Sequence, residues 1–450
     1  MSGFGLRYTW LGKFLWVGLA GYFVAGAGMA CGQPPADATP APQLGAFDKV
    51  WSTVQDRYWG EDFDHARWEQ AREELRPRAA ESADAQQTRA ILEELISRLQ
   101  LSHYAIIPGD IYGAFSQEEG AAGPWESGLR VRIVDGVARV VEVTETSDAY
   151  QQGVRPGWQL VTIGDREVSQ FVAGLVDSLD RQSGYRPQTL AALMIESRLK
   201  GDEAEVLTVR FHDNDGAEQE RKLKLHPPTG EPVKFGYLPE MVIAAESREV
   251  EEGIGYVWFN AFFAPTKVMR AISEAIEQAD RGLIIDLRGN LGGLGAMTMG
   301  VGNRLIDEQD QYLGTQTMKG TQFRYVLNRG PRPYLGPVAV LVDECSISSA
   351  EILARGLQTI GRARVFGVTS AGAALPSVVV ELPNGDYFQF AVADFVDSDG
   401  ERIEGVGVIP DEEVPLTPQD LAAGVDRPLQ AAVEWILSTS PARPSENQTP

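Results

Sequence analysis

The sequence predicts an α/β protein whose core is preceded by a small helical region and a β-rich region. Three patterns support this fold class. Apolar residues recur at helical spacing between residues 46 and 99, short β-type runs separated by turns fill residues 124–226, and strand and helix patterns alternate from Gly253 onward. Such alternation is typical of a layered fold with a largely parallel sheet. The 450 residues suffice for two or three domains with hydrophobic cores of their own.

The first 44 residues predict an export signal and a tether. Arg7 and Lys13 precede an apolar segment that ends in small residues before Cys31, the pattern of a signal peptide over residues 1–30. Ala30–Cys31 resembles the lipobox of bacterial lipoproteins, although Gly28 stands where that motif usually has an aliphatic residue. Cleavage after Ala27 and an uncleaved membrane anchor are the alternatives. We expect an exported protein of the bacterial cell envelope, either periplasmic or held by a lipid on Cys31, with residues 31–44 as a Pro/Ala-rich tether.

Residues 45–122 predict a helical region. Two sets of apolar side chains in it each share one helix face: Phe47, Val50, Trp51, Val54 and Tyr58, then Ile91, Leu92, Leu95, Ile96 and Leu99. The composition adds two exclusions. With a formal net charge of −23 and no basic stripe, the sequence predicts no nucleic-acid partner. With only two cysteines and no Cys/His cluster, it predicts no metal site and no other cofactor.

Residues 123–228 predict a β-rich domain. The run LRVRIVDGVARVVEV reads as two strands around an Asp-Gly turn. The following segment resembles a PDZ domain at five positions: Gly153, Pro156, Gly157, Ile163 and Gly164. The resemblance implies a module that takes an extended peptide as an added strand, here beside Gly128 and Leu129. The alternative is a module that only packs and spaces.

Residues 229–437 predict the α/β core, and residues 438–450 a disordered, Pro-rich tail. Within the core, the strand VAVLVDECS leads directly into the helix SSAEILARGLQTI. Ser348 lies at this turn. Its hydroxyl could cap the helix, or it could be a nucleophile whose oxyanion the free amides of the helix would stabilise. Cys345 is conceivable as a nucleophile, but its surroundings favour a core residue.

Two features favour the nucleophile. The loop RGNLGGLGA follows a buried strand with glycines that let backbone amides approach a ligand, as an oxyanion hole requires. Of the four histidines, only His103 is embedded in apolar sequence, which makes it the candidate base. Lys319 is an alternative base, but burial would have to lower the pKa of its amine to near neutrality.

The segment DLRGNLGG, followed by the Ser-x-Ser-x-x-Glu turn and helix, resembles the C-terminal processing (tail-specific) protease family. So does the order of helical region, PDZ and α/β layer. The resemblance implies a crotonase-like αβ protease core with Ser348 as nucleophile. It also implies an oxyanion hole made by the Ser349 amide and a glycine of the loop, Gly292 or Gly293.

One departure from the family decides the branch. Ala373 stands where the Ser-Lys members carry lysine, so the sequence is closer to the tricorn-core-like Ser-His branch. That resemblance implies that Ser102 and Glu404 orient and polarise His103. Taken singly, Ser102 could cap a turn, Glu404 could be a surface charge and His103 could be a core histidine.

The sequence therefore predicts an exported serine endopeptidase that cleaves unstructured or C-terminal peptide segments. One alternative is an inactive scaffold that keeps the PDZ and protease folds and binds peptides. A crotonase-type enzyme acting on an acyl thioester is a third reading, which the export signal disfavours. The oligomeric state stays open.

Overall fold

The structure is a computed structural model that describes residues 42–107, 125–170, 186–201, 203, 205–238 and 240–439. The predicted signal peptide, the lipidation site Cys31 and nearly all of the predicted tether and tail lie outside these residues. Within these ranges, no helix is both long enough and apolar enough to cross a membrane.

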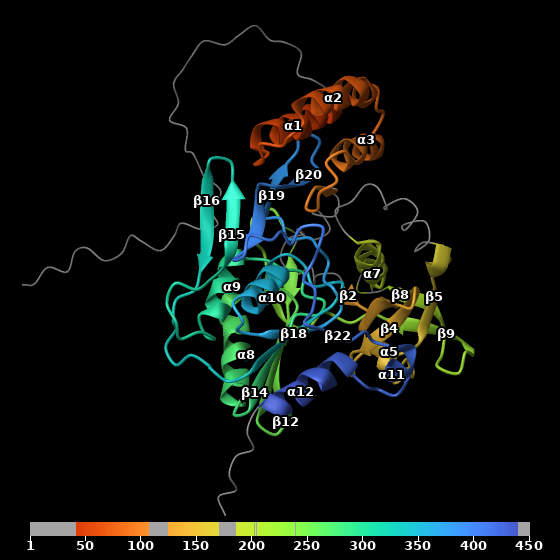
Figure 1. The fold of residues 1–450 in the computed structure, drawn as a ribbon. Helices are drawn as coiled ribbons and strands as arrows, with labels where there is room; N and C mark the ends of the chain where they lie inside the picture. Colours follow the sequence, from red (N-terminus) through yellow and green to blue (C-terminus); the bar gives the residue numbers. More distant parts are fainter. Residues whose placement is uncertain are drawn as a thin grey trace, which may run out of the picture. The chain divides into compact units, whose positions relative to one another are not determined.

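Three helices open the described chain: α1 (Pro42–Arg57), α2 (His65–Ala80) and α3 (Ala85–Ser97), red to orange in Figure 1. Asp64 and Asp84 cap the second and third by accepting a backbone N–H of the first turn. The predicted tether boundary at residue 44 is wrong, because α1 begins at Pro42, whose fixed φ suits a first helical turn.

After α3 the chain joins the core through a short strand. β1 (Ala105–Ile107) pairs antiparallel with β20 (Tyr387–Ala391), which pairs in turn with β19 (Ser377–Glu381). The side chains of Ile106 and Phe388 lie in one buried cluster with the three helices. This pairing places Ser102 and His103, just before β1, beside the core.

The β-rich region folds around a five-strand path, with β3 at one edge and β9 at the other. In chain order its elements are β2 (Trp125–Glu126), β3 (Leu129–Val134), β4 (Val137–Val143), α5 (Asp148–Gln151), β5 (Gln159–Ile163), β6 (Arg166–Glu167), α7 (Pro187–Arg198), β7 (Lys200–Gly201), β8 (Val206–His212) and β9 (Glu218–Lys224). The predicted Asp-Gly hairpin is confirmed, since Asp135 and Gly136 turn with positive φ between β3 and β4. Helix α7 packs against β3.

The core contains a six-stranded sheet in the order β12-β13-β14-β17-β18-β22. Its strands are β12 (Ala245–Glu251), β13 (Ile254–Phe259), β14 (Gly282–Asp286), β17 (Val338–Val342), β18 (Arg364–Gly367) and β22 (Glu412–Glu413). The pairs from β13 to β22 are parallel and β12 is antiparallel, which confirms the predicted largely parallel sheet. Strands β14 and β17 are buried along their whole length.

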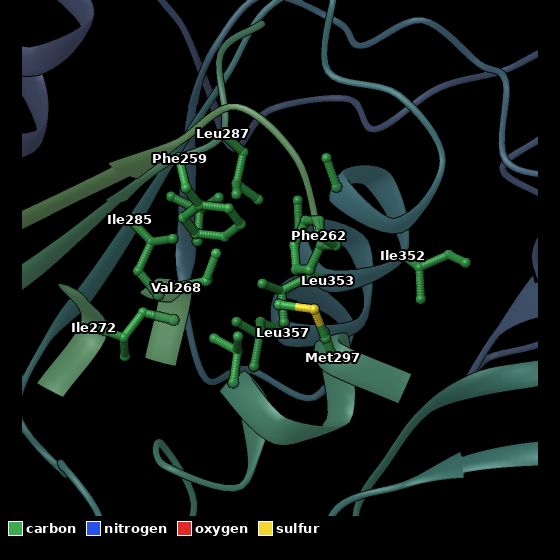
Figure 2. Close-up of a cluster of buried hydrophobic side chains, with 14 of the residues drawn as sticks. Phe259, Phe262, Val268, Ile272, Ile285, Leu287, Met297, Ile352, Leu353 and Leu357 are labelled. Atoms are coloured by element: carbon green, nitrogen blue, oxygen red, sulfur yellow. The ribbon is translucent and has the colours of Figure 1, made fainter. Parts of the chain in front are cut away.

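Helices cover both faces of this sheet. One face carries α8 (Pro265–Glu277), α9 (Gly295–Gly302) and α10 (Ser349–Thr359), whose apolar side chains meet those of β13 and β14. Figure 2 shows this cluster, with Leu353 and Leu357 of α10 facing Val268 and Ile272 of α8. On the other face, α12 (Arg427–Thr439) buries Ile436 against Phe366. The sheet is therefore the middle layer of three.

Smaller elements complete the core. They are β10 (Glu231–Val233), β11 (Met241–Ile243), β15 (Tyr312–Met318), β16 (Thr321–Val326), β21 (Ala393–Asp397) and α11 (Pro418–Ala422). β15 pairs with both β16 and β21. The segments that follow β14 and β17 both leave the carboxyl edge of the parallel sheet, where ligands bind in α/β folds.

Candidate active site

Ser348 occupies a strained turn between β17 and α10. Its φ of 58° and ψ of −116° lie outside the regions that L-residues favour. The Ser348 amide donates to the Ala373 carbonyl (2.9 Å) and to Oε2 of Glu351 (3.0 Å), which holds the turn in place. A serine held at a strained strand-to-helix turn is the arrangement that exposes the nucleophile of α/β-hydrolases.

Glu351 is a buried carboxylate that fixes this turn. Besides the Ser348 amide, it accepts hydrogen bonds from the Ser370 hydroxyl (2.6 Å) and from the amides of Gly372 (2.7 Å) and Ala373 (3.0 Å). Burial raises its pKa to about 7, although these four donors act in the opposite direction. The same side chain thus binds both the serine turn and the segment that faces it.

The glycine loop after β14 lies against Ser348. A side chain at Gly292 would place its Cβ 2.6 Å from the Ser348 Cβ, and the φ of 81° there also requires glycine. The Gly292 amide donates to Oδ1 of Asn290 (2.9 Å), so it is already occupied. Neither the Gly293 nor the Ser349 amide has an acceptor among the described residues, while the Ser349 hydroxyl donates to the Gly293 carbonyl (2.9 Å). Of the two glycines, Gly293 is therefore the one whose amide has no acceptor among the described residues.

Ser102, His103 and Glu404 form a buried hydrogen-bonded chain. The Ser102 hydroxyl lies 2.7 Å from Nδ1 of His103 and donates to Oε2 of Glu404 over 3.0 Å. The Ser102 amide also donates to Oε1 of Glu404 (2.8 Å). Burial lowers the pKa of His103 to about 4, so the imidazole is neutral at neutral pH and can accept a proton.

One dipeptide connects this chain to the serine turn. The Ala374 amide donates to Oε2 of Glu404 (3.0 Å), and the carbonyl of the adjacent Ala373 accepts from the Ser348 amide (2.9 Å). The Ala373 carbonyl and the Ala374 amide belong to one planar peptide group, so the serine turn and the Glu404 carboxylate are anchored to the same peptide unit. Ala373, which stands where the Ser-Lys members carry lysine, contributes only its backbone carbonyl and amide to these hydrogen bonds.

Sequence reasoning missed Asp343 and Arg132. Oδ1 of Asp343 accepts from the amides of Gly289 (2.8 Å) and Cys345 (3.0 Å), which joins the glycine loop to the serine turn. Its Oδ2 accepts from Nε of Arg132 (2.6 Å), a residue of β3 in the β-rich module. Burial opposes the charge, but Arg132 and the Gly289 amide lower the pKa of Asp343. The sequence signal available for Asp343 was an aspartate directly after a buried strand. Nothing in the sequence marks its partner Arg132, which lies 211 positions away.

The other candidates lie elsewhere. Lys319 is exposed and donates to the Asp56 carbonyl (2.9 Å), so it is not the base. Cys345 is buried, which raises the pKa of its thiol well above the usual value and leaves it in the unreactive form. Gly128 and Leu129 lie where the chain enters β3. A Cβ at Gly128 would come within 2.4 Å of the Ser147 Cβ.

Comparison with known proteins shows which families the chain resembles. Residues 253–414 match the model of Peptidase family S41, and residues 43–97 match that of the Tricorn protease C1 domain. The chain is 26% identical over 408 residues to the chloroplastic C-terminal processing peptidase of Tetradesmus obliquus, covering 87% of this chain and 81% of that one. It is 24% identical over 400 residues to the carboxyl-terminal-processing protease of Synechocystis sp., covering 86% and 85%. It is also 26% identical over 412 residues to Tricorn protease homolog 1 of Streptomyces coelicolor, covering 89% of this chain and 35% of that one.

Solved structures agree as well. The photosystem II D1 C-terminal processing protease matches with a TM-score of 0.56 at 20% identity, covering 88% of this chain and 97% of the other. Mature CPAF matches with a TM-score of 0.58 at 15% identity, covering 88% and 96%. The chain thus has the mixed α/β fold of S41 proteases. It is a serine-type peptidase, with a Peptidase family S41 domain over residues 253–414 and a Tricorn C1 domain over residues 43–97.

Proposed function

We propose that this peptidase is an exported endopeptidase that cleaves unstructured or carboxyl-terminal segments of proteins, with Ser348 as nucleophile and His103 as base. The observation that carries the proposal is the buried chain from Glu404 through Ser102 to His103, anchored to the same dipeptide as the Ser348 turn. The relatives named carboxyl-terminal-processing protease support the substrate class. The apolar segment before Cys31 supports export.

In this proposal each group has one role. With Nδ1 protonated, His103 donates to the Ser102 hydroxyl, which donates in turn to Glu404, and Nε2 is the nitrogen that accepts the serine proton. The imidazole then takes the Ser348 proton as Oγ attacks the scissile carbonyl carbon. The amides of Gly293 and Ser349 would donate to the oxyanion that forms.

Collapse of that intermediate breaks the C–N bond and leaves an acyl group on Ser348. His103 returns its proton to the leaving amine, and then takes one from the water that hydrolyses the ester. Glu404 stays ionised throughout and stabilises the imidazolium through Ser102. This relay replaces the lysine of the Ser-Lys branch, which position 373 cannot supply.

In the β-rich module, the resemblance to PDZ domains and the edge of β3 that has no strand partner among the described residues support a role in holding the substrate as an added strand. No cofactor enters the proposal.

The test is cleavage of unfolded β-casein by residues 32–450, at about pH 6 to 9, where a histidine base is neutral. Mass spectrometry maps the products. We expect the wild type and a Ser273→Ala control on α8 to cut, and Ser348→Ala to leave the casein intact. Cleavage by Ser348→Ala at the wild-type rate would show that the nucleophile is another residue. No cleavage by any form would favour a peptide-binding scaffold.

A further inference from the structure

Strand β3 has one side without a strand partner in the described part of the chain, because it is first in the order β3-β4-β5-β8-β9. The amides of alternate residues face such an edge. Two of them already have a side-chain acceptor. The Val131 amide donates to Oε1 of Glu196 (3.0 Å), and the Leu129 amide donates, more weakly, to the Ser127 hydroxyl (3.4 Å).

The contacts at Val131 imitate one residue of a paired strand. Its amide meets a carboxylate oxygen of Glu196, and its carbonyl accepts from Nη1 of Arg132 (2.8 Å). The same Nη1 donates to Oε1 of Glu196 over 2.8 Å. An acceptor and a donor, joined to one another, therefore face Val131 as the C=O and N–H of an incoming peptide residue would.

The Arg132–Glu196 pair also occupies the space that an incoming strand would need. Glu196 belongs to α7, the helix that packs against β3, so it spans the space between the helix and the open edge. Arg132 is 4% exposed and Glu196 26%. Burying an ion pair contributes little net stability, so its presence at the edge calls for another explanation.

The proposed function has the substrate pair with the β3 edge; we propose further that the Arg132–Glu196 pair keeps this edge closed until an extended segment of the substrate displaces it. The proposal rests on the proposed function, since the occupant is substrate. An extended backbone fits because it offers Val131 a carbonyl and an N–H at once. Arg132 keeps Asp343 as its partner after Glu196 leaves, so the buried guanidinium is never unpaired.

The test uses residues 32–450 carrying Ser348→Ala, so that substrate is bound without being cut. Fluorescein-labelled, unfolded β-casein is the probe, and its anisotropy gives the affinity. We expect Glu196→Ala to bind casein about tenfold more tightly, because the peptide no longer competes with a charged hydrogen bond. Glu196→Gln, which keeps an acceptor for Val131 but loses the charge, should lie in between.

Two controls isolate the edge. Glu220→Ala, on β9 at the opposite edge of the sheet, should bind like the parent. Val131→Pro added to Glu196→Ala removes the edge amide and should abolish the gain. An unchanged or weaker affinity in Glu196→Ala would show that the pair only anchors α7, and would overturn the proposal.

Hydrogen–deuterium exchange over residues 129–134 provides a reading that does not depend on a folding-sensitive double variant. Exchange at Val131 should be faster in Glu196→Ala and slow again when casein binds. Faster exchange that casein does not reverse would also overturn the proposal. Because every form carries Ser348→Ala, this result is independent of the peptidase test: binding that competes with Glu196, together with a wild type that cuts nothing, would defeat the proposed function alone.

Discussion

At the scale of single residues, the site depends on how Glu404 is used. Its two oxygens accept three hydrogen bonds, from the amide and hydroxyl of Ser102 and from the Ala374 amide. Burial raises the pKa of Glu404, yet these donors favour its ionised form. In the proposed mechanism, the carboxylate acts on the imidazole through the Ser102 hydroxyl.

Glu404→Gln tests this relay. The amide keeps the size of the side chain but directs N–H groups at donors, so the Ser102 hydroxyl loses its acceptor and the imidazole its polarisation. We expect kcat to fall by about 10²-fold or more with KM little changed. Kinetics on a fluorogenic peptide taken from a mapped casein cleavage site measure both constants. An unchanged kcat would reduce Glu404 to a structural role.

More could be predicted about which residues are candidates for the site than about how their side chains are arranged. The serine turn, the glycine loop and His103 each carry a local signal, namely a polar cluster after a buried strand, a run of glycines and a lone apolar histidine. The four donors of Glu351 and the bond between Arg132 and Asp343 carry none, because both depend on distances between segments. Likewise, only the Asn290 bond distinguishes Gly292 from Gly293 as a donor.

At the scale of elements, Asp343 joins three segments: the glycine loop, the serine turn and β3. Asp343→Asn leaves Arg132 with Glu196 as its charged partner but removes the charge that the two loop amides share. We expect a loss of about 1–3 kcal/mol in the free energy of unfolding, together with reduced kcat, because both loops of the site lose their common charged acceptor. Urea unfolding and kinetics measure the two effects.

The matched control is Arg132→Met with Asp343→Asn. Removing both charges should cost less than the sum of the single variants, because each single variant already loses the Arg132–Asp343 interaction. Strict additivity would mean that the two side chains do not act as a pair.

The sequence predicted individual helices and strands better than it predicted which of them lie side by side. Hairpin chemistry at Asp135–Gly136 and strand–helix alternation in the core are local patterns, and the structure confirms both. The start of α1 was missed because a Pro-rich run also suits a first helical turn. The strand order, the pairing of β1 with β20 and the place of α7 against β3 follow from tertiary packing, which periodicity does not encode.

At the scale of the whole molecule, the site combines distant parts of the chain. Ser102 and Glu404 are 302 positions apart and meet because β1 and β20 pair. A sequence pattern can single out candidate residues for such a site, and a family resemblance can suggest their roles. Neither predicts that Ala373 and Ala374 bind both the Ser348 turn and the Glu404 carboxylate.

The stability of the fold should depend on pH through Glu351. Burial raises its folded-state pKa to about 7, above its ordinary value of 4.5, so the buried charge costs stability. Its contribution is fully present below about pH 4.5 and is lost as the pH rises through 7. We expect Glu351→Gln to lose stability relative to the wild type at pH 5, and to lose less at pH 8. Urea midpoints at the two pH values check this, and a difference independent of pH would contradict it.

The most direct test of the central claim is covalent labelling with a fluorophosphonate, followed by mapping of the adduct by mass spectrometry. We expect one adduct, on Ser348, and a labelling rate that falls by about 10²-fold or more in His103→Ala and in Glu404→Gln while both variants keep the wild-type circular dichroism. An adduct on a different residue, or a rate on Ser348 that is the same with and without His103, would contradict the relay that the structure presents.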